Sequence, residues 1–195
     1  MKKVIGVYGL SGAGKTTFTK KLASLGAIVI DADETGRKIL AKGSPLLSRI
    51  KELFGDAVIA EDGSLLRKKL GDIVFNSSEK LALLNSVTRP EIGSLISEEI
   101  NSLSVGIIII DCAMIKELEI VKLCDELVFI TAPEEILISR LLARENISEE
   151  TARGRIRLQM ESMDSSGAVI IENTGTEEEF MKKCEEYAER LNREV

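Results

Sequence analysis

The chain has 195 residues, a length typical of one domain, and 44% of them are apolar, which is enough for a packed core. The formal net charge of −6, from 26 basic and 32 acidic residues, argues against broad binding to nucleic acids or anionic membranes. Histidine is absent, so histidine-based catalysis and histidine metal sites are excluded. The three cysteines are far apart and form no CxxC pair, so we expect neither a disulfide framework nor a zinc site, and we expect a cytoplasmic protein.

Five short apolar runs alternate with helical patterns along the chain. The runs cover residues 3–8, 27–30, 106–110, 126–131 and 168–172, and the first helical pattern covers residues 16–25. Continuous apolar runs are typical of strands that are covered on both faces in a parallel sheet. The alternation therefore predicts an α/β fold with a parallel sheet between two helical layers. No run approaches the roughly 18 residues of a membrane span, and no signal peptide is recognised.

Two stretches exceed what this layout needs within a single domain of residues 1–195. Residues 34–104 are mostly helical, with a turn at Asp62-Gly63 and a helix that we expect Pro90 to open. They are longer than a crossover requires, which predicts an inserted helical lobe. In residues 133–163, the spacing of Thr131 and Glu134 predicts a capping box at the start of a helix that ends at Glu145. A second helix follows, and the pair carries five arginines, which predicts a lid.

A glycine-rich loop follows the first predicted strand. Its sequence GLSGAGKT, residues 9–16, fits G-x-x-x-x-G-K-[ST] at every fixed position, and a helix follows it as the motif requires. In such a loop the backbone N–H groups and the helix N-terminus bind phosphates, the lysine reaches the β- and γ-phosphates, and the hydroxyl after it binds Mg²⁺. The loop therefore predicts a nucleoside triphosphate site made of Gly9, Ser11, Gly12, Ala13, Gly14, Lys15, Thr16 and Thr17.

Charged residues at predicted strand ends and on the lid are candidates for catalysis. Asp33 follows the second strand and could accept a hydroxyl proton, or could cap the next helix with help from Asp31. Asp111 ends the third strand like a Walker-B carboxylate near Mg²⁺, or is an ordinary solvated residue. Arg140 and Arg144 lie four residues apart and share a helix face, from which they could neutralise a transferred phosphoryl group or simply face solvent.

Together these residues resemble the dephospho-coenzyme A kinase family. The similarity covers nearly the whole chain and is more specific than the phosphate loop alone. Besides that loop it includes the motifs Asp31-Ala-Asp33 with Gly36-Arg37, Phe54-Gly55, residues 62–70, Pro90, Arg140 with Arg144, residues 155–159 and residues 171–175.

The resemblance implies transfer of the ATP γ-phosphoryl group to the ribose 3′-hydroxyl of dephospho-coenzyme A, the last step of coenzyme A synthesis. It implies that Asp33 is the base, that Arg140 acts on the transferring group, and that Arg67 approaches the acceptor. Asn173 would lie beside the ATP base, and Arg37 would bind the acceptor. An exposed helical residue is the alternative for Arg67.

Two departures from the family pattern fall on the acceptor side. Arg89-Pro90 stands where the family usually has His-Pro, and Ala113-Met-Ile-Lys116-Glu117 stands where it has Pro-Leu-Leu-Phe-Glu. Either Arg89 or Lys116 could meet the acceptor pyrophosphate, or Lys116 could face solvent. A kinase for another small hydroxylated metabolite or nucleoside, and a non-catalytic nucleotide-binding module, remain alternatives. The oligomeric state stays open.

Overall fold

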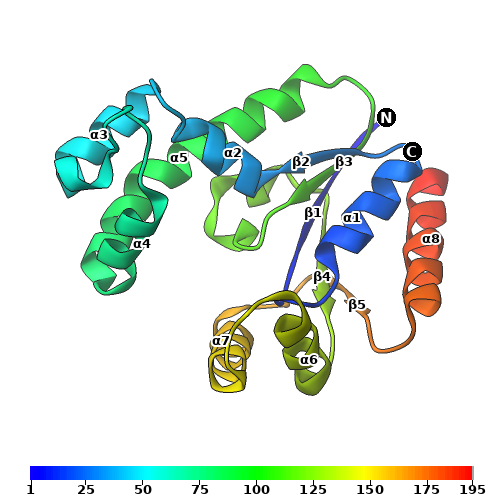
Figure 1. The fold of residues 1–195 in the computed structure, drawn as a ribbon. Coiled ribbons are helices and arrows are strands. Elements are labelled where there is room, and N and C mark those ends of the chain that lie inside the picture. The colour runs from blue at the N-terminus through cyan, green and yellow to red at the C-terminus, as the bar shows by residue number, and fades with distance from the viewer. Residues whose placement is uncertain (195) are drawn as a thin grey trace.

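The fold is built on one parallel sheet, which a computed structural model describes together with the rest of residues 1–194. Its strands are β1 (Lys2–Gly9), β2 (Ile28–Asp31), β3 (Gly106–Asp111), β4 (Glu126–Thr131) and β5 (Val169–Glu172), in the order β2-β3-β1-β4-β5 (Figure 1). All neighbouring strands run parallel. The five predicted strands and their parallel arrangement are therefore confirmed.

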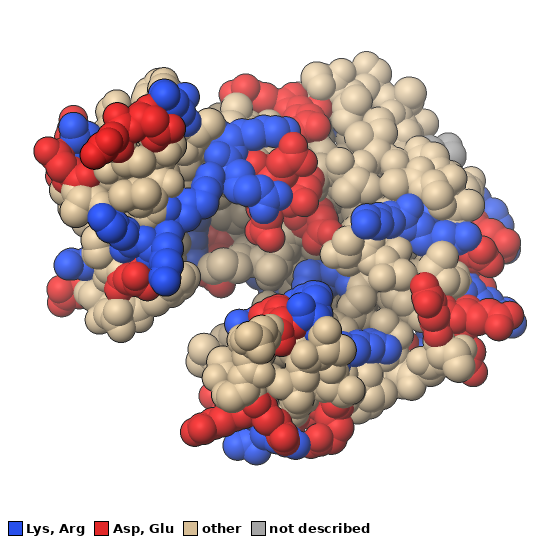
Figure 2. Space-filling model, viewed as in Figure 1, with Lys and Arg blue, Asp and Glu red and all other residues tan. Residues whose placement is uncertain are grey.

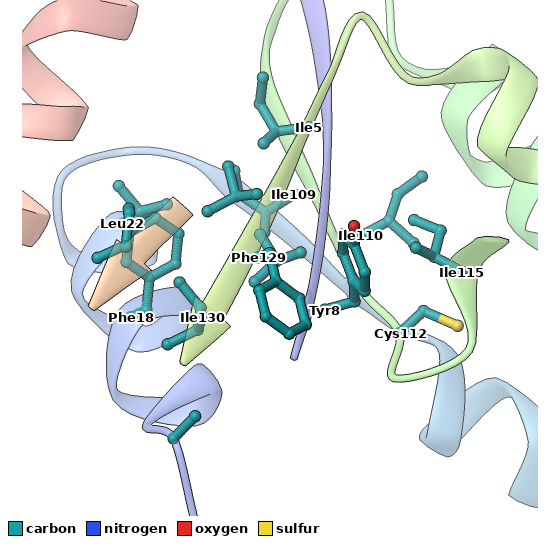
Figure 3. Packing of buried hydrophobic residues seen from close by; sticks show 14 of the residues in the cluster. Ile5, Tyr8, Phe18, Leu22, Ile109, Ile110, Cys112, Ile115, Phe129 and Ile130 are labelled. Atoms are coloured by element: carbon teal, nitrogen blue, oxygen red, sulfur yellow. The ribbon is translucent and has the colours of Figure 1, made fainter. Parts of the chain in front are cut away.

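Helices cover both faces of the sheet. On one face α1 (Lys15–Ser24) packs beside α8 (Glu177–Glu194); on the other lie α5 (Ser78–Ser102) and the short 3₁₀ helices η2 (Ile115–Glu117) and η3 (Glu119–Leu123) (Figure 1). Phe18 and Leu22 fill one side of the strands and Ile115 the other, all at most 2% exposed (Figure 3). The predicted three-layer α/β fold is confirmed.

The segment between β2 and β3 forms a helical lobe beside the sheet. It contains α2 (Ala32–Ile39), α3 (Pro45–Phe54), η1 (Asp56–Val58), α4 (Arg67–Phe75) and the first part of α5 (Figure 1). The lobe has a hydrophobic cluster of its own, separate from the cluster around the sheet, centred on Ile50, Val58, Leu70 and Val74. At the predicted turn, the Asp62 carboxylate accepts hydrogen bonds from the Ser64 N–H and hydroxyl.

The expected helix start at Pro90 is wrong. Pro90 lies inside α5, which begins at Ser78 after the Ser77 hydroxyl accepts a hydrogen bond from the Lys80 N–H. Proline removes one helical hydrogen bond. Buried residues before and after it, Thr88 and Ile96 among them, pack against the rest of the protein and keep the helix continuous. At 25 residues α5 is the longest helix, and no helix within residues 1–194 is long and apolar enough to cross a membrane.

A helical hairpin follows β4. It consists of α6 (Glu134–Arg144) and α7 (Glu149–Ser162), close to the predicted bounds. The capping box predicted from Thr131 and Glu134 is wrong, because the N-cap position of α6 is Pro133. Thr131 is the last residue of β4 and lies two positions before the N-cap, so its hydroxyl is not placed to accept a hydrogen bond from the first helical turn.

The separate core of the lobe yields a stability prediction. Ile50 is fully buried in it, so Ile50→Ala should lower the free energy of unfolding by about 2–5 kcal/mol through lost burial and the cavity left behind. Urea unfolding followed by circular dichroism measures this. Ser48→Ala on the exposed side of α3 is the control and should change it by less than about 0.5 kcal/mol. Equal stability of the two variants would contradict a packed lobe.

Candidate functional site

The glycine-rich loop connects β1 to α1, and its glycines are required by space. A Cβ atom at Gly9 would lie 2.0 Å from the carbonyl oxygen of Ile130, and one at Gly14 would lie 2.6 Å from Nδ2 of Asn173. Gly14 also has a φ of +102°, which side chains rarely tolerate. The loop can therefore pass this close to β4 and to the end of β5 only with glycine at these positions.

The loop borders an open cavity of about 470 Å³. Gly14 is the N-cap residue of α1 and offers no side chain to the first helical turn, so the N–H groups there are available to an anion. The cavity brings together residues predicted for the nucleotide from the loop, from α6 and from the end of β5: Ser11, Gly12, Gly14, Lys15, Thr16, Thr17, Arg140, Arg144 and Asn173. Gly9 and Ala13 shape the loop from behind and do not line the cavity.

Lys15 lies across its own loop. Its ammonium donates hydrogen bonds to the carbonyls of Gly9, at 2.9 Å, and Leu10, at 3.4 Å. Burial lowers the pKa of Lys15, and the nearby carboxylates of Asp111 and Asp33 counteract this by favouring the charged form. The ammonium is thus held between the phosphate loop and two acidic residues at the carboxyl edge of the sheet.

Arg140 and Asn173 hold the loop from the side of the hairpin. The Arg140 guanidinium donates to the carbonyl of Gly12 at 3.3 Å and to Oδ1 of Asn173 at 3.1 Å. The Asn173 amide in turn donates to the carbonyl of Ala13 at 2.9 Å, and this side chain is buried. Asn173 therefore fixes the backbone of the loop itself, a contact that its expected place beside a nucleotide base did not anticipate.

Gln159 of α7 forms a second clamp on the loop. Its Oε1 accepts a hydrogen bond from the Ser11 N–H and its Nε2 donates to the Ser11 hydroxyl, both at 2.9 Å. The two bonds join residues that are 148 positions apart in the chain. A paired amide contact of this kind fixes both the position and the orientation of Ser11.

The hairpin arginines divide into two groups. Arg140 and Arg144 line the cavity, as their shared helix face predicted. The other three pair with carboxylates of the hairpin itself: Arg153 with Glu135 and Glu149, Arg155 with Glu145, and Arg157 with Glu134. Three of these four ion pairs join α7 to α6 or to the turn between them, and the fourth, Arg153 with Glu149, lies within α7. None of the three arginines lines the cavity.

Three aspartates gather where β2 and β3 end. The register pairs Asp31 with Asp111 across the two strands. Asp31 is the N-cap residue of α2, where its Oδ1 accepts a hydrogen bond from the Glu34 N–H at 2.9 Å. Asp33 is exposed on the first turn of α2 and makes no side-chain hydrogen bond within residues 1–194. The capping role that competed with catalysis for Asp33 therefore belongs to Asp31.

Asp111 is partly buried behind the loop. Its Oδ2 accepts a hydrogen bond from the Thr19 hydroxyl at 3.2 Å. Burial raises the pKa of Asp111, while the Thr19 hydrogen bond and the Lys15 charge counteract this. The alternative of an ordinary solvated strand-end residue does not fit this environment.

The oxygen donors near the loop suit a magnesium ion that also binds phosphate. They are the Thr16 hydroxyl and the carboxylate of Asp111, which are hard ligands of the type that Mg²⁺ prefers. Among the described residues no group of three or more acidic, cysteine or histidine side chains could hold a metal ion alone. Mg²⁺ in kinases keeps waters and phosphate oxygens as ligands, so one or two protein carboxylates are sufficient.

The predicted acceptor residues fall into two places. Arg67, at the start of α4, donates to the carbonyl of Arg37 on α2 at 3.2 Å, which brings these two residues together one turn from Asp33. Arg89 of α5 pairs instead with Glu117 of η2. Basic side chains of the lobe border a hollow between the lobe and the rest of the molecule (Figure 2).

The Lys116 side chain is paired within the protein and does not simply face solvent. Its ammonium binds Oδ2 of Asp164 at 2.8 Å and the carbonyl of Ser166 at 2.9 Å, and lies 5.8 Å from the ring centre of Tyr8. The Tyr8 hydroxyl donates to the carbonyl of Asp164 at 2.8 Å. Lys116 therefore anchors the segment after α7 to the sheet, and only a quarter of its side chain is exposed.

The sequence interpretation missed three residues of the site. Glu177 and Phe180, from the start of α8, line the cavity, and Gln159 holds the loop. The residues of α8 follow an ordinary amphipathic pattern, so nothing in it marks a cavity wall. Gln159 was recognised only as part of a shared motif, which gives no contact partner.

Comparison with known proteins agrees with this arrangement. The model of the dephospho-CoA kinase family matches residues 3–179. A dephospho-CoA kinase from Carboxydothermus hydrogenoformans is 39% identical over 178 residues, covering 89% of this chain and 86% of that protein. The chain belongs to the dephospho-CoA kinase family. It is thus a transferase of coenzyme A biosynthesis whose family uses ATP as phosphoryl donor.

Solved structures support the fold of this family. The crystal structure of TT1252 from Thermus thermophilus matches with a TM-score of 0.81 at 27% identity, over 97% of this chain and 98% of that one. The dephospho-CoA kinase from Campylobacter jejuni matches with a TM-score of 0.67 at 27% identity, over 97% of both chains. The fold of a P-loop kinase, expected from the loop and the strand pattern, is confirmed.

The clamp on Ser11 predicts a defect in nucleotide binding. Gln159→Leu removes the amide oxygen and nitrogen that bind Ser11 and leaves the Ser11 N–H and hydroxyl unpaired. This destabilises the present conformation of the loop by about 1–3 kcal/mol. The KM for ATP should rise about tenfold, with a smaller change in kcat, in steady-state kinetics. Leu158→Ala changes an exposed neighbour on α7 that makes no contact with Ser11, so this control should lie close to wild type. An unchanged KM for ATP in the leucine variant would show that the clamp does not order the loop.

Proposed function

We propose that the chain transfers the γ-phosphoryl group of ATP to the ribose 3′-hydroxyl of dephospho-CoA and produces CoA and ADP. One observation supports this most directly: the phosphate loop and an uncommitted carboxylate, Asp33, lie at the same carboxyl edge of the sheet. A pure nucleotide-binding module needs only the loop. A carboxylate next to it suits the transfer of a proton from a hydroxyl acceptor.

Asp33 is the group that orients the acceptor and takes its proton. As the bond between the 3′-oxygen and the γ-phosphorus forms, the hydroxyl proton moves to the Asp33 carboxylate and the β–γ bridging oxygen leaves with ADP. Lys15 and Arg140 line the same cavity from the loop and from α6, where they would face the phosphates of ATP. Their positive charges offset the negative charge that builds up on the transferred group and the leaving oxygen.

The Thr16 hydroxyl and Asp111 would hold Mg²⁺ with the phosphates of ATP. When bound, the ion neutralises phosphate charge and aligns the γ-phosphoryl group. Asp111 also has a role that is independent of the metal, because its charge favours the protonated form of the Lys15 ammonium. Arg144 and Asn173 contribute the remaining cavity wall on the nucleotide side.

The helical lobe of residues 34–104 is the acceptor side and residues 133–163 are the lid. Arg37 and Arg67 face the acceptor together from the lobe, and Arg89 reaches it from α5. The contacts of Lys116 with Asp164 and Ser166 favour Arg89 as the basic partner of the acceptor pyrophosphate. Closing the lid over ATP would exclude water and limit hydrolysis. We also propose a cytoplasmic enzyme without nucleic-acid partners, in keeping with the net charge of −6 and three free thiols.

The role of Asp33 is tested by an isosteric substitution. Asp33→Asn should lower kcat by about 10²–10⁴, the typical contribution of a general base, while ATP affinity stays close to wild type. A coupled ADP-release assay measures kcat, and calorimetry measures the affinity for ATP. Asp31→Asn is the matched control, because asparagine is also a good N-cap residue and this variant should keep most of its kcat. A nearly normal kcat in Asp33→Asn would remove Asp33 from catalysis.

The acceptor is tested with a panel in the same assay. Dephospho-CoA should be the acceptor that supports ADP release, with product phosphorylated at the 3′-position. Turnover with another hydroxylated metabolite or nucleoside instead would make the chain a kinase of different specificity. ATP binding with no turnover on any acceptor would point to a nucleotide-binding module.

The environment of Lys15 predicts a pH dependence. Burial lowers its pKa from the ordinary value of 10.5, and only the charged ammonium attracts phosphate. The value of kcat/KM for ATP should therefore fall on the alkaline side at a pH below 10.5. In Lys15→Arg the guanidinium stays charged, so the remaining activity should lack this decline. A decline that persists in the arginine variant would assign it to another group.

A further inference from the structure

A second large groove lies between α5 and η3, outside the nucleotide cavity. It has a volume of about 500 Å³, which is within the range of small-molecule sites. Gly93 of α5 forms part of its floor, where a Cβ atom would be 3.8 Å from Cγ2 of Ile120. The other apolar surfaces come from Pro90, Leu118 and Leu123.

The groove combines apolar walls with a few polar groups. Ser94 and Ser97 present hydroxyls from α5, and Arg89 and Glu117 form an ion pair at one end. Glu119 and Lys122 of η3 also line the groove, and their charges are paired with each other. Within the described chain the Arg89 guanidinium has Glu117 as its only hydrogen-bond partner, so several of its N–H groups remain available. This set suits a ligand that carries an anionic group followed by a flexible, uncharged chain.

The end of the groove with Arg89 lies toward the catalytic carboxylates. Gly36, one turn after Asp33 on α2, packs against α5, since a Cβ atom there would be 3.5 Å from Cδ1 of Ile92, the residue before Gly93 of the groove. The segment after Asp111 leads from the carboxyl edge of the sheet to this end of the groove, because η2 begins four residues later and its Glu117 pairs with Arg89. A ligand with one end at Asp33 can therefore continue into the groove.

We propose that the groove between α5 and η3 binds the pantetheine arm of dephospho-CoA, with Arg89 at the pyrophosphate that precedes it. The arm has geminal methyl groups, two amides, a hydroxyl and a thiol, and carries no charge. Its methyl and methylene groups match Pro90, Leu118 and Leu123, and its amides match the serine hydroxyls. This inference rests on the proposed acceptor, and it assigns the part of that acceptor that takes no part in phosphoryl transfer.

The test fills the groove without breaking contacts between elements. The Ser97 hydroxyl bonds only to the carbonyl of Gly93 in its own helix and the Ser94 hydroxyl only to Glu98, so leucine can replace either. In Ser94→Leu and Ser97→Leu the KM for dephospho-CoA should rise tenfold or more, while kcat and the KM for ATP stay within twofold. Ser86→Leu on the exposed lobe part of α5 is the matched control and should leave all three unchanged.

Inhibition by the two halves of the acceptor distinguishes binding in the groove from binding in the rest of the acceptor site. At saturating ATP, 4′-phosphopantetheine and adenosine 5′-phosphate should each compete with dephospho-CoA in the wild type. The groove variants should raise the inhibition constant of phosphopantetheine about tenfold and leave that of adenosine 5′-phosphate unchanged. Thermal melting confirms that each variant is folded.

Three results would overturn the assignment: an unchanged KM for dephospho-CoA in a folded groove variant, a parallel rise in both inhibition constants, or no competition by phosphopantetheine in the wild type. Failure of the proposed function has a different signature, namely no turnover of dephospho-CoA by the wild type. In that case calorimetry of phosphopantetheine with wild type and Ser97→Leu tests the groove by itself, and equal affinities for the two would overturn it.

Discussion

A phosphate-binding loop is useful only if its backbone N–H groups keep one arrangement, and glycines by themselves favour many. Here the loop is fixed by side chains from distant parts of the chain. Asn173 binds the carbonyl of Ala13, Arg140 binds that of Gly12, and Gln159 binds both polar groups of Ser11. Because β4 lies directly against Gly9, the loop is also packed from below. The glycines permit the conformation, and the surrounding elements select it.

Charge is arranged around this fixed loop in two opposing sets. Lys15, Arg140 and Arg144 face the cavity. Asp111 ends β3, and Asp33 lies on the first turn of α2. Burial acts in opposite directions on the two types of group, since it lowers the pKa of Lys15 and raises that of Asp111. Lys15 and Asp111 counteract this effect in each other, because the charge of each favours the charged form of its partner.

The parts of the site that local sequence determines were predictable. The spacing of Gly9, Gly14 and Lys15 defines the loop, and continuous isoleucine and valine runs define the buried strands, so the sheet and the nucleotide side followed from the sequence. Contacts between distant segments were not predictable, because no local pattern indicates that Gln159 binds Ser11 or that Lys116 binds Asp164. The helix start predicted at Pro90 was wrong for the same reason. The packing of buried residues such as Thr88 and Ile96 stabilises the helix by more than the one lost hydrogen bond destabilises it.

Gln159 and Arg140 lie on the two arms of one hairpin, and both bind the loop through its backbone. The free energy of the loop conformation therefore depends on the position of the hairpin. The free energy of each hairpin position depends on the loop conformation by the same amount. Linkage of this kind is reciprocal. Binding of a triphosphate that stabilises one loop conformation therefore also favours one position of the hairpin. The hairpin can respond to nucleotide binding in this way without a separate signal.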